Sequence, residues 1–193
     1  MKERGIDIVF TATRREDVKK RFFIKTVSRQ LFGRLSCSVA IVRVVRMGGV
    51  HPKNILVPLR GRITNLEERA YFTAKLAEGF GSRATLFHLH KPMTSFFHGE
   101  VHLTPFQREQ HIPKDVEEFR EHLTRYRILH EKKTSGGSVA GAITIEAAHK
   151  RNDLIIMGAS ERSLLRSLVK GNPLEDVMRH TPCNMIVFRG KKQ

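Results

Sequence analysis

Short apolar runs rich in β-branched residues recur along the chain, and the segments between them are long enough for helices. Strands that are apolar on both faces are typical of a parallel sheet that is covered on both sides. The runs are Ile8–Phe10, Val39–Val42, Ile55–Val57, Ala84–Phe87, Leu154–Met157 and Met185–Phe188. The pattern therefore predicts an α/β fold.

Between these runs, apolar residues return every three or four positions, which predicts helices that pack on the sheet. The clearest helix covers Leu66–Phe80, with Asn65 as its N-cap and Gly81 as its stop. Most of its charged residues, Arg69 among them, are assigned to the positions that face away from the sheet. The other predicted helices are Lys114–Tyr126 (opened by Pro113), Val139–Lys150 and Pro173–His180.

Two segments lack a helical period. Arg127–Lys132 is polar and short, and we predict an edge strand there, followed by a loop over Thr134–Ser138. Lys91–Ile112 contains prolines and several histidines without a clear period. We predict a long loop for that segment.

The chain resembles itself at an offset of 146 residues. The identical pairs between residues 7–43 and their counterparts are Asp7 and Asp153, Cys37 and Cys183, and Arg43 and Arg189. The apolar pattern also matches at two strands and at the helix between them, and a domain-sized offset indicates duplication. We therefore expect residues 1–46 to be a partial β-α-β unit from the end of one copy. Residues 47–53 would be a linker, and residues 54–190 a complete second copy.

Composition bounds the class of protein. The chain has 193 residues, of which 40% are apolar, so it can bury a core and is not a disordered basic tail. Its net charge is +16, and residues 1–53 hold 13 Lys and Arg against 4 Asp and Glu. Such a charge favours anionic partners. Two cysteines without a secretory signal, and no apolar run near the roughly 20 residues of a membrane span, predict a cytoplasmic chain.

A glycine-containing turn follows one predicted strand. Gly158-Ala159-Ser160-Glu161 comes directly after Met157, and Gly171-Asn172 precedes the helix that begins at Pro173. Glycines at such places let backbone N–H groups approach a phosphate, and the dipole of the helix favours its negative charge. Glycines are also common at strand ends for purely structural reasons, so both interpretations stay open here.

The order of these segments, from Asn54–Pro58 through Ala84–His88 to Asp153–Gly158 and His180–Val187, resembles the universal stress protein family over residues 53–190. Residues 6–46 resemble the C-terminal third of the same family. The resemblance implies a five-stranded parallel sheet in the order 3-2-1-4-5 with helices on both faces, a fold like that of the adenine-nucleotide alpha-hydrolases. It also implies pairing through the last strand, with Val39–Val44 antiparallel to Met185–Phe188.

Many members of that family bind ATP through a G-x2-G-x9-G-[S/T] motif and an Asp after the first strand. By this resemblance, the expected nucleotide-binding residues are Pro58, Arg60, Gly61, Met157, Gly158, Arg162, Gly171 and Asn172. Three positions depart from the motif: Glu161 replaces the middle glycine, Asn172 the final Ser or Thr, and Arg60 the Asp. A carboxylate at position 161 opposes a polyphosphate, whereas Arg60, Arg162, Arg166 and Lys170 can offset it. We therefore expect ATP binding to be weak or absent, with Mg²⁺ only as the partner of ATP.

Other chemistry has less support in the sequence. His88 and His90, with His98, His102 and His111 after them, could hold a metal, but no cysteine or spaced carboxylate completes a known pattern. Cys37 and Cys183 lack an evident base partner and are interpreted as packing residues. The sequence contains no Ser-His-Asp, paired-carboxylate or zinc-hydrolase signature. We predict neither a metal site nor enzymatic activity.

The sequence thus predicts a non-catalytic regulatory module of the universal stress type in stress response, acting through dimerisation or docking. A second hypothesis is an ATP-binding switch with slow hydrolysis. A third is a cytoplasmic regulatory tail of a cation antiporter or amino-acid permease, associated with an anionic membrane surface, and a fourth is a basic nucleic-acid-binding protein. For the basic run Arg14–Arg21 we favour a solvated face over nucleic-acid contact. The expected partner is a second copy or tandem domain, or a membrane transporter.

Overall fold

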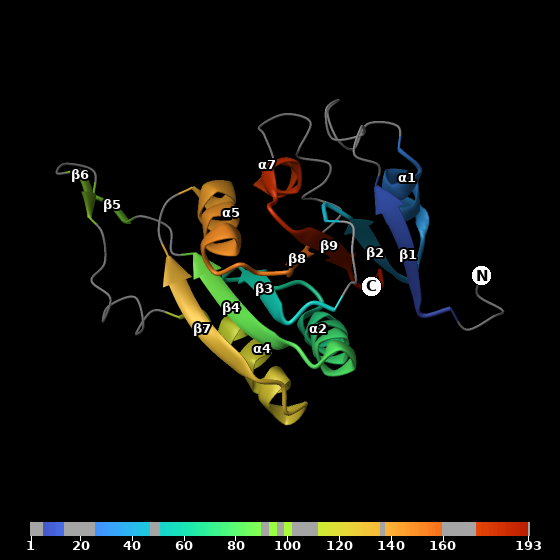
Figure 1. The fold of residues 1–193 in the computed structure, drawn as a ribbon, viewed down its shortest axis with the longest axis horizontal. Coiled ribbons are helices and arrows are strands. Elements are labelled where there is room, and N and C mark those ends of the chain that lie inside the picture. Colours follow the sequence, from blue (N-terminus) through green and yellow to red (C-terminus); the bar gives the residue numbers. More distant parts are fainter. Residues whose placement is uncertain are drawn as a thin grey trace.

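A seven-stranded sheet forms the centre of the molecule (Figure 1). The computed structural model describes residues 6–13, 26–46, 51–89, 93–95, 99–101, 112–135, 138–159 and 173–192. The strand order is β1-β2-β9-β8-β3-β4-β7. These strands are β1 (Ile8–Thr13), β2 (Ser38–Arg43), β3 (Asn54–Leu59), β4 (Arg83–Leu89), β7 (His130–Ser135), β8 (Leu154–Gly158) and β9 (Asn184–Arg189).

Five of these strands form the parallel sheet that the sequence predicts. β7, β4, β3, β8 and β9 lie side by side in that order, and every neighbouring pair is parallel. This is the expected order 3-2-1-4-5. The whole sheet has seven strands rather than five, because β2 pairs antiparallel with β9, as expected for Val39–Val44 and Met185–Phe188, and β1 pairs parallel with β2. The N-terminal strands therefore extend the same sheet, and β2 satisfies the backbone groups along an edge of β9 that would otherwise stay open.

The ladder between β2 and β9 has the symmetry of the sequence repeat. Ile41 lies opposite Val187, and these two residues are 146 positions apart, so an approximate two-fold axis passes between them. The helices α1 (Val27–Arg34) and α7 (Pro173–His180) are related by the same offset. So are the pairings of Ile8 with Ser38 and of Leu154 with Asn184. The shared register supports duplication, while the division into a partial copy, a linker and a complete copy stays a prediction.

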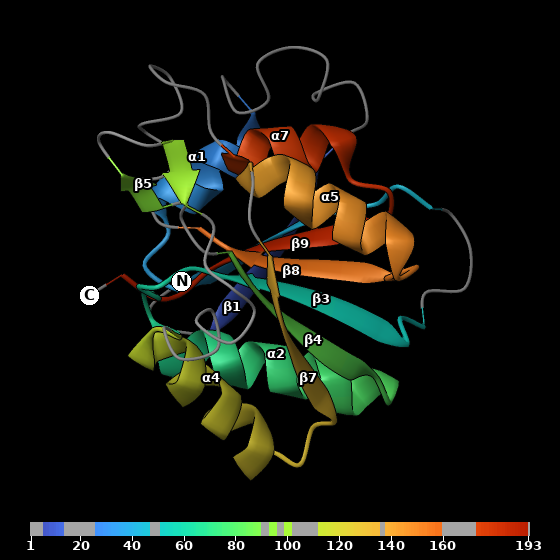
Figure 2. The same ribbon diagram turned by 90° about the vertical axis from the view of Figure 1, so that its left-hand side faces the viewer.

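Helices cover both faces of the sheet (Figure 2). On one face, α2 (Leu66–Phe80) and α4 (Lys114–Arg125) bury a core that includes Val57 and Phe119. On the other, α1, α5 (Val139–His149) and α7 bury a core that includes Leu56 and Ile143. Because neighbouring residues of β3 point to opposite faces, Leu56 and Val57 belong to different cores. This explains why the strands are apolar at nearly every position.

The helix ends differ in detail from the predictions. Asn65 precedes α2 in the left-handed conformation (φ 51°), and its side chain does not cap the helix. Its Nδ2 donates instead to the carbonyl of Lys191, at 2.8 Å. Gly81 ends α2 with φ 61°, as predicted. α4 begins at Lys114 after Pro113, as predicted, with Pro113 as its N-cap, and α4 and α5 each end one residue before the predicted position.

The polar edge strand lies further along the chain than predicted. Arg127 has a φ of 56° and forms part of the turn after α4, so β7 begins at His130. The strand then runs through Thr134 and Ser135, which were expected in a loop. The segment predicted as one long loop contains an antiparallel hairpin of β5 (Met93–Ser95) and β6 (Gly99–Val101). Pairing with β4, which sequence periodicity does not report, sets the register of β7.

Candidate functional site

A cavity of about 830 Å³ opens at the carboxyl ends of β3 and β8, the two central parallel strands. The helices that follow these two strands, α2 and α7, lie on opposite faces of the sheet, so the chain leaves the two strand ends in opposite directions. Ligands of doubly wound α/β folds bind at such switch points. Residues from both strands, from α2, α5 and α7, and from the chain after β9 line the cavity.

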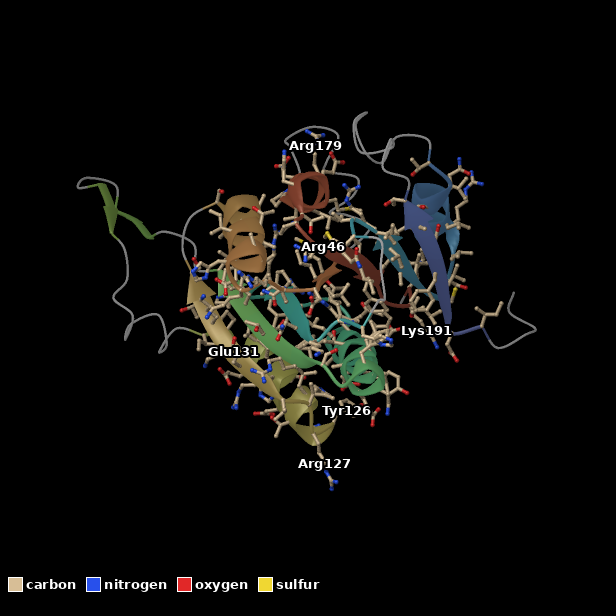
Figure 3. The ribbon with its side chains drawn as sticks, viewed as in Figure 1. Arg46, Tyr126, Arg127, Glu131, Arg179 and Lys191 are labelled. Carbon is tan, nitrogen blue, oxygen red and sulfur yellow. The ribbon has the colours of Figure 1, made fainter. Side chains whose placement is uncertain are left out.

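Six of the lining residues are basic, and none of the described lining residues is acidic. The basic residues are Arg60, Arg62, Arg69, Arg189, Lys191 and Lys192. Lys191 lies between α2 and the start of β1 (Figure 3), where its Nζ pairs with Asp7 at 2.8 Å. Arg189 donates from Nη2 to the carbonyls of Leu35 and Cys37, at 2.9 and 3.0 Å. A concave wall of one sign of charge concentrates anions.

Arg69 is the buried member of this group. It stands in the first turn of α2 with only 7% of its surface exposed, and its Nη2 donates to the carbonyl of Pro58 at 2.9 Å. The guanidinium also lies 5.9 Å from the centre of the Phe119 ring. Within the described residues, Arg69 Nε is buried without a hydrogen-bond partner. Burial lowers the pKa of Arg69 from 12.5 to about 10, so the side chain stays charged at neutral pH.

The expectation that Arg69 faces away from the sheet is wrong. Its spacing from Leu66 and Thr73 places it on the buried face of α2, and that spacing is visible in the sequence. A charged residue at a core position was the signal that could have identified it. Buried charges of this kind are rare unless they are paired.

Gly158 and Arg69 occupy adjoining space. A Cβ atom built on Gly158 would lie 2.4 Å from Arg69 Nη1 and 2.5 Å from its Cζ. The end of β8 therefore passes directly over the guanidinium. Arg69 reaches the carboxyl ends of both central strands, through a hydrogen bond at β3 and through close contact at β8.

The structure brings together four of the expected nucleotide-binding residues. Pro58 and Arg60 at β3, and Met157 and Gly158 at β8, all line the cavity. Gly61 is exposed and packs near α4, where an added Cβ would lie 3.2 Å from Pro113 Cγ. The remaining expected residues, Arg162, Gly171 and Asn172, lie outside the described residues, as do Glu161, Arg166 and Lys170.

The comparisons with known proteins agree with this geometry. A model of the universal stress protein family matches residues 52–189. The chain belongs to the universal stress protein family. No curated protein sequence matches the chain significantly.

Solved universal stress proteins share this fold at low sequence identity. A structure from Archaeoglobus fulgidus DSM 4304 is 16% identical with a TM-score of 0.63, and covers 99% of this chain, which spans 63% of that one. A universal stress protein in complex with cAMP is 12% identical with a TM-score of 0.55, over 71% of this chain and 96% of that one. A family member from Burkholderia pseudomallei is 18% identical with a TM-score of 0.53, over 72% and 98%.

The histidine and cysteine candidates lie in other settings. His88 in β4 is buried, its Nδ1 lies 3.2 Å from the carbonyl oxygen of Leu59, and burial lowers its pKa. In the part of the chain that the structure describes, no three His, Cys, Asp or Glu residues form a group that could hold a metal. The other four histidines of the metal hypothesis, His90, His98, His102 and His111, lie outside that part.

Cys183 in this universal stress domain is fully buried, and burial raises the pKa of its thiol to about 11. Such a thiol is protonated at neutral pH and is a poor nucleophile. Thr181 Oγ1, beside it, donates to the carbonyl of Cys183 at 2.8 Å. Both side chains thus act in packing at the start of β9.

Proposed function

We propose that this universal stress domain is a regulatory module that binds an adenine nucleotide in the cavity at the carboxyl ends of β3 and β8. The observation that carries the proposal is the cavity itself, which has six basic lining residues and no acidic residue in its described wall. One solved relative is described as a complex with cAMP, which supports a nucleotide as the class of ligand. The module acts through the state of this site rather than through catalysis.

The residues at the motif positions favour a weak site. Arg60 stands where the family pattern has an Asp, and Glu161 stands where it has the middle glycine. A carboxylate near a polyphosphate opposes its binding, whereas cations at the rim offset part of that repulsion. Any Mg²⁺ would enter with ATP.

The test is a thermal-shift and calorimetric titration of the whole chain with ATP, ADP, cAMP and adenosine. We expect ATP to bind and raise the melting temperature, with adenosine binding more weakly. Glu161→Gly should raise ATP affinity about fivefold, since it removes one like charge worth about 1 kcal/mol at a solvated site. The matched control is Glu121→Gln, an exposed change on α4. No shift at millimolar ATP in either the parent chain or Glu161→Gly would contradict the proposal.

Association is a separate proposal. The basic run at residues 14–21, on which the nucleic-acid and membrane-surface hypotheses depend, lies outside the described residues. No helix among the residues that the structure describes is long and apolar enough to cross a membrane. A transporter tail would bind anionic vesicles with an affinity that falls with salt, and a nucleic-acid binder would show the same dependence with DNA or RNA.

A further inference from the structure

We propose that Arg69 forms an anion subsite at the floor of the cavity, which takes one phosphate group of the ligand, and that Gly158 leaves the space that its guanidinium needs. This inference rests on the proposed nucleotide function for the identity of the ligand. The subsite itself depends only on the chemistry of an anion and a buried cation.

The first argument is the incomplete pairing of the buried charge. Arg69 is 7% exposed, yet within the described residues its charge is stabilised by one neutral carbonyl and one aromatic face. Taking a guanidinium out of water is expensive, and buried arginines normally have a carboxylate or several acceptors. Arg189, in comparison, donates to three carbonyls, those of Leu35, Cys37 and Gly190. Arg69 has donors left over in a cavity wall.

The second argument is the place of that charge. Arg69 lines the cavity and contacts the carboxyl ends of both β3 and β8. Ligands of α/β folds bind at this end of the strands. A guanidinium presents parallel N–H groups that match the oxygens of a phosphate, and such bonds are stronger than neutral ones. A bound phosphate would supply the acceptors that the described protein does not.

The third argument concerns the rim. Arg60 and Arg62 are exposed and line the same cavity, so they add positive charge at its mouth. A ligand with several negative charges can contact both these arginines and Arg69, whereas a ligand with a single charge contacts Arg69 alone. We therefore expect affinity to rise in the order monophosphate, diphosphate, triphosphate.

The test compares Arg69→Met with the parent chain, because methionine keeps an unbranched side chain and removes the charge. Inorganic triphosphate, ATP and adenosine are the probes in calorimetric titrations of the whole chain. Arg69→Met should weaken triphosphate and ATP binding by about 10- to 100-fold, the usual range for one hydrogen-bonded charge, and leave adenosine unchanged. Arg83→Met is the control. Arg83 is exposed at the amino end of β4, whereas the cavity lies at the carboxyl ends of the strands.

The outcomes separate the two proposals. Equal ATP affinity in Arg69→Met and the parent chain would overturn the subsite and leave the nucleotide function standing. Triphosphate binding that depends on Arg69, with no gain from the adenosine part of ATP, would overturn the nucleotide function and support the subsite. Absence of triphosphate and ATP binding both to the parent chain and to Glu161→Gly would overturn both.

A second measurement covers the case in which Arg69→Met does not fold. In the parent chain, the side-chain Nε–H resonance of Arg69, assigned with Arg69→Lys, should shift when triphosphate is added. An unchanged resonance at saturating triphosphate would overturn the subsite. Lysine keeps the positive charge but cannot donate two parallel hydrogen bonds, so Arg69→Lys should retain part of the affinity for triphosphate.

Discussion

At the scale of single residues, two glycines of this chain have opposite surroundings. Gly158 lies at the end of β8 against the Arg69 guanidinium, whereas Gly79 lies in α2 with nothing within 4 Å of an added Cβ. A methyl group added at the first glycine would force the buried Arg69 guanidinium to move. The second has only the conformational cost of a glycine within a helix.

We therefore expect Gly158→Ala to destabilise the protein by about 1–3 kcal/mol, the usual range for overpacking a core. Gly79→Ala should instead stabilise it by about 0.5–1 kcal/mol. Urea unfolding of both variants measures the difference. Arg69→Ala in the background of Gly158→Ala should recover stability relative to the sum of the single changes, since it removes the atoms that clash. Strict additivity of the two changes would contradict the contact.

The sequence predicted cavity residues at the ends of β3 and β8, but it did not predict the cavity residue on α2. Pro58, Arg60, Met157 and Gly158 follow from strand positions and the family pattern, and they line the cavity. Arg69 was missed because a charged residue on a helix is normally solvated. Its spacing along α2 could have shown that it is buried, but its closeness to β8 depends on the packing of α2 under the sheet, which the sequence pattern does not contain.

At the scale of elements, the edge strand β7 is held to α5 by an ion pair. Lys133 Nζ donates to both carboxylate oxygens of Glu146, at 2.8 and 2.7 Å. The side chain of Glu146 is 9% exposed and that of Lys133 is 37% exposed. Removing the lysine therefore leaves a buried carboxylate, whereas removing the glutamate leaves a partly exposed ammonium group.

Lys133→Met should destabilise the protein by about 1–3 kcal/mol, because it leaves a buried carboxylate without its cation. Glu146→Gln should be milder, since the lysine can reach water. The control is Lys75→Met, which removes a partner from the exposed pair of Lys75 and Glu78 and should cause no measurable change. Thermal unfolding ranks the three variants, and a larger effect of Glu146→Gln than of Lys133→Met would contradict this account.

Element prediction from sequence succeeded where burial is strong. The six apolar runs all lie in strands, and the helix at Leu66–Phe80 has its predicted bounds. The polar strand β7 was displaced by a few residues because its position depends on pairing with β4 rather than on its own periodicity. The two short strands of the β5–β6 hairpin show no alternation of apolar and polar residues, so the sequence pattern did not predict them.

At the scale of the whole molecule, the N-terminal unit and the universal stress domain share one sheet through the β2–β9 ladder. The two units also meet through side chains: Phe10 of β1 lies 6.2 Å from Phe72 of α2. Within the universal stress domain, Phe72 in turn stacks on Phe188 of β9 with ring centres 4.4 Å apart. The offset of 146 residues in the sequence predicted this arrangement in outline. The repeat alone does not state whether two units share one sheet, but the expected antiparallel pairing of Val39–Val44 with Met185–Phe188 did, and the β2–β9 ladder has that pairing.

A charge placed in this ladder should open the outer edge of β9. Ile41 is fully buried opposite Val187, so Ile41→Lys should detach β2 and make the protein associate in a concentration-dependent way. Val44→Lys is the control, because Val44 directly follows Arg43, the last paired residue of β2, and is 50% exposed. Size-exclusion chromatography with light scattering over a range of concentrations gives the mass. Ile41→Lys that stays folded and monomeric would contradict the prediction.

The two-fold register of β2 and β9 also has a kinetic meaning. A partner strand on the same chain is present at an effective concentration on the order of millimolar, however dilute the protein is. A separate copy that competes for β9 must displace a neighbour that never diffuses away. Exchange of partners at this edge therefore requires β2 to open, and at protein concentrations below the effective one β2 recloses before most encounters with a second copy.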